Sequence, residues 1–145
     1  MKLISLITAL LLAVSSCFAQ EISEKNLRKH VTYLASDKLQ GRGTGTPAEL
    51  KAAEYIAKQF KKIGLSPKGD NGAWFHAFGF KKSSDPHGGI SENSPQIYSR
   101  NVAGYLDNGA EHTIVIGAHY DHLGLGLDHN SLEANSAGMI HNGAD

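Results

Sequence analysis

The sequence has a single cysteine, and this residue, Cys17, lies within the first 20 positions. The rest of the chain therefore has neither a disulfide framework nor thiolate ligands for a metal. Any metal site in it must be built from imidazole and carboxylate groups. Cations are missing from the C-terminal part, because every lysine and arginine lies between Lys2 and Arg100. A nucleic-acid-binding protein is expected to carry a basic stripe beside its working residues, so that class is excluded.

The sequence also lacks an apolar run long enough to span a membrane. The mainly apolar run 3–14 is shorter than the roughly 20 residues that a spanning helix needs. With Lys2 before it and small residues after it, this run has the layout of a secretory signal. We expect residues 1–19 to be a signal peptide and residues 20–145 to be secreted or periplasmic. The alternative is a lipoprotein signal ending in "VSSC", in which Cys17 would be acylated and would anchor the chain at the cell envelope.

What the C-terminal part does contain is acids and histidines. Residues 101–145 hold five of the eight histidines, and their charged residues are all acidic. The histidines are His112, His119, His122, His129 and His141, and the acids are Asp107, Glu111, Asp121, Asp128, Glu133 and Asp145. These are the donor types that bind divalent metals when cysteine is absent.

Two helices are predicted in the first half of the chain. Ser23 can cap the first, which is expected to end near Ser36. The second is expected to begin at "TPAE", residues 46–49, as a capping box with proline in the first turn, and to end at Gly64. The glycines of "GRGTG", residues 41–45, follow a helix and have the wrong spacing for dinucleotide binding. We interpret them as a loop with unusual dihedral angles.

Strands are predicted at 74–80, 101–106 and 112–119, the last two joined by a tight turn. Residues 113–118 form a continuous, largely β-branched apolar run, which is typical of a strand covered on both faces. His119 would then follow the end of a buried strand. Ligands of open α/β sheets bind just outside the carboxyl ends of the strands, so we expect a functional site at His119.

His119 and Asp121 are spaced so that the acid can orient the histidine. A histidine that binds zinc usually donates its other ring N–H to a carboxylate. For an isolated His-x-Asp, a loop histidine hydrogen-bonded to an acid is the simpler interpretation. Asp145 has two carboxylate oxygens, which can bridge two cations roughly 3.5 to 4 Å apart. It could equally be a turn residue, and its position alone does not decide between the two.

The segments "NVAGYL", "TIVIGAHYDHLG" and "HNGAD", in this order, resemble the secreted di-zinc aminopeptidases of metallopeptidase family 28. "LASDKLQGRGTGTPAE" resembles a segment that many bacterial members carry near the mature N-terminus. The resemblance covers residues 22–145. It implies an α/β fold, a three-layer α/β/α sandwich around a mixed, mostly parallel sheet, and peptide substrates with free N-termini. It also implies two zinc ions, with His119 as a ligand, Asp121 as the acid behind it and Asp145 as the bridging carboxylate.

The match is incomplete at its C-terminal side. The family's general-base glutamate and its remaining zinc ligands have no counterpart here, so residues 20–145 are expected to be the N-terminal portion of a truncated peptidase domain. His122, Asp128, His129 and His141 are interpreted as exposed or structural loop residues rather than replacement ligands. Expressed alone, residues 20–145 are expected to be poorly soluble and inactive, because the run 113–118 would lack its cover.

Three other functions remain open from the sequence. Zinc amidohydrolases of the aminoacylase or carboxypeptidase type also place His-x-Asp after a strand, and glutaminyl cyclase uses the same fold with one metal. A non-catalytic binding domain of this fold, without metals, is the alternative from another class. The metal content of the protein separates an enzyme from such a module. The oligomeric state is not indicated.

Overall fold

The computed structural model of the protein describes residues 22–83, 89–127, 131–133 and 135–143. The predicted signal peptide, Cys17 and Asp145 lie outside this part of the chain. Two compact units are distinguished, Met1–His30 and Val31–Asp145. Within the described residues, no helix combines the length and the apolar character that crossing a membrane requires.

The two predicted helices are present. The first, α2, runs over Glu24–Leu34, and the Ser23 hydroxyl accepts a hydrogen bond from the Asn26 amide at 3.3 Å. Ser23 is therefore the cap that the sequence indicates. None of the eleven described residues of this helix is buried. The helix is followed by the 3₁₀ segment η1, Asp37–Arg42, in which Gln40 and Gly41 have positive φ angles. This segment contains the start of the predicted irregular loop.

Helix α3, Pro47–Lys62, begins as predicted at Thr46, whose hydroxyl accepts from the Glu49 amide at 3.3 Å. The return bond of the capping box is shifted by one residue, since the Glu49 carboxylate accepts from the Gly45 amide instead of the Thr46 amide. The same carboxylate accepts from the hydroxyl of Ser99, and Glu49 is 2% exposed. The cap of α3 therefore also holds strand β3, Gln96–Val102, to which Ser99 belongs.

The C-terminal end of α3 is a Schellman motif at the predicted glycine. Gly64 has φ +85°, and its amide donates to the Lys61 carbonyl at 3.2 Å. The Leu65 amide donates to the Phe60 carbonyl at 3.1 Å. These two bonds satisfy carbonyls that the helix leaves without partners, and glycine adopts the required dihedral angle without strain.

The core of the described residues is small and is built mainly from alanine. Four alanines of α3 and one leucine of η1 are its buried apolar residues, namely Leu39, Ala48, Ala52, Ala53 and Ala57. Their short side chains let the helix backbone approach η1 and β3, which both pack against it.

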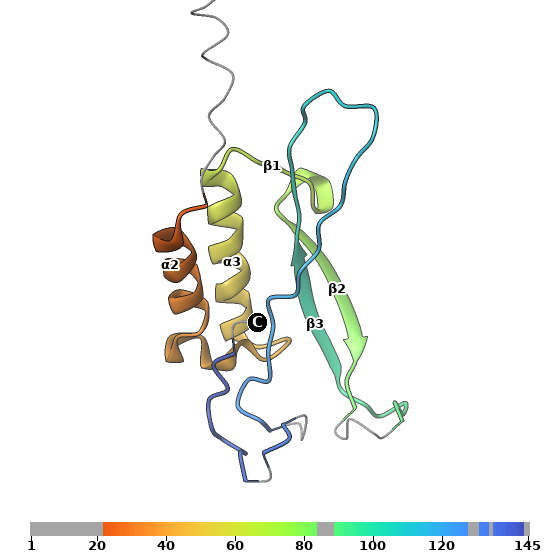
Figure 1. The fold of residues 1–145 in the computed structure, drawn as a ribbon. Helices are drawn as coiled ribbons and strands as arrows, with labels where there is room; N and C mark the ends of the chain where they lie inside the picture. The colour runs from red at the N-terminus through yellow and green to blue at the C-terminus, as the bar shows by residue number, and fades with distance from the viewer. Residues whose placement is uncertain (1–21, 84–88, 128–130, 134, 144–145) are drawn as a thin grey trace, which may run out of the picture. The chain divides into compact units, whose positions relative to one another are not determined.

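Two antiparallel pairs make up the described β structure. Strand β2, Phe75–Lys81, pairs along its length with β3, Gln96–Val102 (Figure 1). Strand β1, Ser66–Pro67, pairs with β4, Gly104–Tyr105. A second 3₁₀ turn, η2, Asp70–Gly72, precedes β2. The strand predicted at 74–80 is thus confirmed to within one residue at each end.

The predicted three-layer α/β/α sandwich with a mostly parallel sheet is wrong for this structure. Both sheets of the described residues are antiparallel and two-stranded, and parallel pairing there is limited to one isolated bridge between Gly43 and His122. The prediction came from the resemblance to the di-zinc aminopeptidases, and the continuous β-branched run 113–118 was interpreted as one of the covered strands of such a sheet. Such a run shows a preference for extended structure, but it does not specify a neighbouring strand.

The run 113–118 shows this most clearly. Residues 112–119, all of them described, form no strand, although a strand was predicted there. Ile114, Val115 and Ile116 are 88%, 88% and 93% exposed. This apolar segment therefore has the composition of a buried strand without its packing.

We expect this exposed segment to drive self-association. Contiguous β-branched residues without charge or proline pair readily with other chains when they are exposed. In a concentrated solution of residues 20–145, Ile116→Lys should lower the average mass of the particles, measured by light scattering and sedimentation. Ile63→Lys is the matched control, since Ile63 is a 69% exposed isoleucine outside the segment. Equal association in both variants would contradict the expectation.

Candidate metal centre

The candidate site begins with the histidine and the acid of "HYD". The Nδ1 atom of His119 lies 3.0 Å from the backbone carbonyl oxygen of Asp121 and 3.2 Å from its carboxylate Oδ1. Both neighbours are acceptors, so Nδ1 carries a proton, and in the neutral ring the lone pair is then on Nε2. The structure therefore brings His119 and Asp121 together in the arrangement by which a carboxylate orients a metal-binding imidazole. The His119 side chain is 63% exposed.

The other oxygen of the same carboxylate is fixed by Thr44. The Thr44 hydroxyl donates to Asp121 Oδ2 at 2.5 Å, across 77 residues of sequence. One oxygen of Asp121 thus contacts the imidazole and the other accepts from a hydroxyl, which restricts rotation of the carboxylate. Thr44 belongs to the glycine-rich segment 41–45, so this loop contributes directly to the candidate site.

Tyr120, between the two site residues, anchors them. Its phenol donates to the Arg100 carbonyl in β3, and its own carbonyl accepts from Arg42 Nε at 2.8 Å. Burial raises the pKa of the Tyr120 phenol from 10.0 to about 12, and the nearby charge of Glu49 adds to the shift. The phenol therefore stays protonated near neutral pH and can continue to donate. Because Tyr120 is held at both its backbone and its side chain, the flanking His119 and Asp121 are positioned on fixed backbone.

Arg42 is the buried centre of this part of the molecule. It is 3% exposed, and its guanidinium donates to three backbone carbonyls, those of Leu34, Tyr120 and Gly143. Its backbone has φ +49°, which is strained for a residue other than glycine. Its own carbonyl accepts from the His122 amide at 3.0 Å. Arg42 therefore joins the end of α2, the "HYDH" segment and the "HNG" part of "HNGAD".

Glycine is required where these segments meet. Gly41 has φ +68°, and a Cβ atom there would lie 2.4 Å from the Gly124 carbonyl oxygen and 2.5 Å from that of His141. The Gly124 amide donates to the Gly41 carbonyl, and the His141 amide donates to the Gly124 carbonyl, at 2.9 and 3.0 Å. The interpretation of "GRGTG" as a loop with unusual dihedral angles is confirmed. The close approach of Gly41 to Gly124 and His141 explains why this position requires glycine.

The remaining histidines of the region have packing contacts. The ring of His122 lies against Gly143, where a Cβ atom would be 2.2 Å from Nε2. The ring of His141 lies near Gly126, where a Cβ atom would be 2.7 Å from Nε2. Asp128, His129 and Asp145 fall outside the described residues. No group of three or more His, Cys, Asp or Glu side chains within the described residues is arranged to hold a metal ion.

The structure thus brings together the motifs "GAHYD" and "HNGAD" through Arg42. For the second motif this holds for the described residues, which end at Gly143. Three residues of this arrangement were missed: Arg42, Thr44 and Tyr120. Arg42 and Thr44 stand in "GRGTG", which was read only for its glycines. The available signal was Arg42, a cation between two glycines. No neighbouring acid in the segment explains a charge there, which indicates a partner elsewhere in the chain.

No protein-family model, curated protein or solved structure matches this chain.

Proposed function

We propose that the protein is a zinc-dependent aminopeptidase, a metalloexopeptidase that removes N-terminal residues from peptides. The observation that supports this most is the pair His119 and Asp121, in which the oxygens of the acid accept a hydrogen bond from Nδ1–H, the tautomer whose lone pair is on Nε2. The resemblance of "GAHYD" and "HNGAD" to the di-zinc aminopeptidases supplies the reaction class.

In this proposal His119 would hold a zinc ion through Nε2, and Asp145 would be the carboxylate ligand that the resemblance implies. The donor chemistry fits, since imidazole and carboxylate are ordinary zinc ligands and the His119 tautomer is the one a metal requires. Catalytic zinc sites usually have three protein ligands per ion, so the proposal needs ligands in addition to these two. When bound, zinc lowers the pKa of a coordinated water to about 7 and polarises the scissile carbonyl.

The residues of this chain orient the site. Asp121 accepts a hydrogen bond from Nδ1–H of His119, and the Thr44 hydroxyl donates to the Asp121 carboxylate. Tyr120 and Arg42 fix the backbone on which both site residues stand. This division of roles is what a metal ligand needs, because small displacements of a ligand weaken metal binding and reduce turnover. The proton-transfer step is not assigned to any residue of the chain.

The proposal is tested by the dependence of hydrolysis on metal and on a free α-amine. Expressed from its complete gene, the protein should release nitroaniline from leucine p-nitroanilide and not from the N-acetylated compound. A zinc chelator should stop the release, and added zinc should restore it. Hydrolysis that continues in chelator, or that is as fast on the acetylated compound, would overturn the proposal.

A further inference from the structure

The tetrapeptide Asp-Asn-Gly-Ala occurs twice in the chain, at residues 70–73 and 107–110, and a third Asn-Gly pair is Asn142-Gly143. Asparagine is a thermolabile residue, and a glycine after it favours loss of the side-chain amide. The glycine nitrogen attacks the asparagine Cγ, and glycine has no Cβ atom to obstruct closure of the succinimide ring. The two identical tetrapeptides are equally reactive by sequence, so any difference between them comes from their hydrogen bonds.

In the segment 107–110 both reacting groups are bound by their neighbours. The Gly109 amide donates to Asp107 Oδ1 at 2.9 Å, so a carboxylate contacts the proton that the attacking nitrogen must lose. The Asn108 side-chain oxygen accepts from the Ala110 amide at 3.3 Å, in an Asx turn. This amide therefore donates to the oxygen on which negative charge develops during the attack. All four residues are exposed, so water reaches them.

The segment 70–73 has the same residues in a different arrangement. The Gly72 amide donates to the backbone carbonyl of Gly69 at 3.3 Å, and the Ala73 amide donates to the backbone carbonyl of Asp70 at 2.9 Å. The Asp70 carboxylate is bound elsewhere, since its Oδ2 accepts from a backbone amide of β2 at 2.9 Å. The proton of the attacking nitrogen thus lies on a carbonyl, which accepts a hydrogen bond but does not take up a proton near neutral pH.

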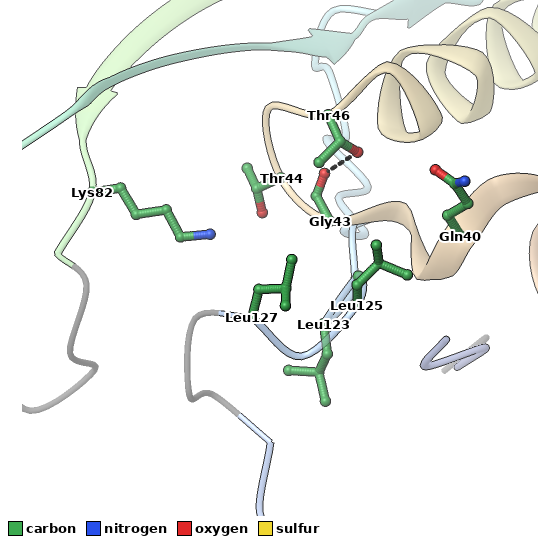
Figure 2. Close-up of a pocket in the computed structure, with 9 residues that line it drawn as sticks. Gln40, Gly43, Thr44, Thr46, Lys82, Leu123, Leu125 and Leu127 are labelled. Atoms are coloured by element: carbon green, nitrogen blue, oxygen red, sulfur yellow. Dashed lines mark hydrogen bonds between the residues drawn. The ribbon is translucent and has the colours of Figure 1, made fainter. Parts of the chain in front are cut away.

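The third asparagine, Asn142, is restrained by packing. Its Nδ2 atom donates to Asp37 Oδ1 at 2.6 Å, and its own Oδ1 is buried. The preceding residue, His141, donates its amide to the Gly124 carbonyl at 3.0 Å, in the loop whose leucines are labelled in Figure 2. The Gly143 carbonyl accepts from a buried guanidinium. Ring closure at Asn142 therefore requires several of these contacts to break.

We propose that Asn108 is a self-modification site, which converts to isoaspartate and aspartate in the folded protein. Asp107 takes the Gly109 proton as the Gly109 nitrogen bonds to Asn108 Cγ. The Cγ–Nδ2 bond then breaks, and the side-chain nitrogen leaves as ammonia with that proton. Water opens the succinimide, giving isoaspartate by attack at the backbone carbon and aspartate by attack at Cγ. Each conversion consumes one water, releases one ammonia and adds one negative charge.

The reaction requires no metal, so it is independent of the proposed peptidase activity. The formal net charge of the chain is zero, and the modified protein should therefore separate from the parent as a more acidic species. The turn that gains this charge already contains Asp107 and Glu111.

Peptide mapping by mass spectrometry measures the rate of conversion at each asparagine. In the folded protein, expressed from its complete gene and held at mildly alkaline pH, Asn108 should convert at least about tenfold faster than Asn71 and Asn142. In concentrated urea Asn108 and Asn71 should convert at equal rates, because their tetrapeptides are then alike. An unmodified Asn108, or an Asn71 that reacts as fast in the folded protein, would overturn the proposal. So would a preference for Asn108 that persists in urea.

The role of Asp107 is tested by substitution. Asp107→Ala should slow the conversion of Asn108 by about tenfold, because it removes the group that takes the proton. Glu111→Ala is the matched control, since it removes an exposed acid of the same charge from the same turn and should leave the rate unchanged. A parental rate in Asp107→Ala, or equal slowing in the two variants, would overturn the proposal.

Discussion

Replacing Arg42 with methionine is expected to lower the free energy of unfolding by on the order of 3 kcal/mol. The substitution keeps a long side chain but removes every donor from a 3% exposed position. The carbonyls of Leu34, Tyr120 and Gly143 then lose their partners. Each buried carbonyl left without a hydrogen bond costs about 1–3 kcal/mol, and partial access of water reduces the sum. Urea denaturation of the two proteins measures the difference.

Two further variants show whether the loss of stability comes from the hydrogen bonds of the Arg42 guanidinium. Arg42→Lys should recover only part of the loss, because an ammonium cannot reach three carbonyls with the geometry of a guanidinium. Arg28→Met is the matched control, since Arg28 is exposed and pairs with Glu24 on the same helix. Such an exposed pair contributes about 0.3–0.5 kcal/mol. If Arg42→Met were no less stable than Arg28→Met, Arg42 would not hold these segments together.

The second large effect concerns zinc affinity. Asp121→Asn should weaken zinc binding by about 10–100-fold, the usual result when the partner of a ligating histidine is altered. The amide removes the negative charge that holds the Nδ1 proton of His119, and its NH₂ group can favour the wrong tautomer. His119→Ala should weaken binding further, because it removes the ligand itself. Competition with a chromophoric chelator measures each affinity.

The control for this series is Asp107→Asn. Asp107 is an exposed acid whose Oδ1 accepts from the Gly109 amide. Asp107→Asn changes the charge by the same amount as Asp121→Asn, and Asp107 has no hydrogen bond to His119. Zinc affinities that fall equally in the two variants would show that the loss reflects net charge, and the orienting role of Asp121 would be disproved. Thr44→Val should give a smaller loss than Asp121→Asn, because it removes one hydrogen bond from the carboxylate and no charge.

The sequence predicted best those features that depend on neighbouring residues. The start of α3 at Thr46 and its end at Gly64 follow from side chains and dihedral angles within one turn of the helix. The pairing of His119 with Asp121 is also local, since the two are separated by one residue. In each case the chemistry of a short stretch restricts the backbone to few conformations.

The fold class failed because it depends on distant partners. Whether residues 113–118 lie in a sheet depends on another segment that pairs with them, and neither composition nor periodicity names that segment. The start of β3 at Gln96 was missed for a related reason: its pairing with Lys81 crosses a polar loop. Arg42 is 78 residues from Tyr120 and 101 from Gly143, so its contacts leave no pattern within a sequence window.

The zinc content of the protein shows whether His119 and Asp145 are metal ligands. Purified from its complete gene and freed of loosely bound metal, the protein should contain two equivalents of zinc by elemental analysis, as the bridging role proposed for Asp145 requires. The double variant His119→Ala, Asp145→Ala should contain close to none while keeping the circular dichroism spectrum of the parent. Equal zinc in the parent and the double variant, or no zinc in the parent, would contradict the account.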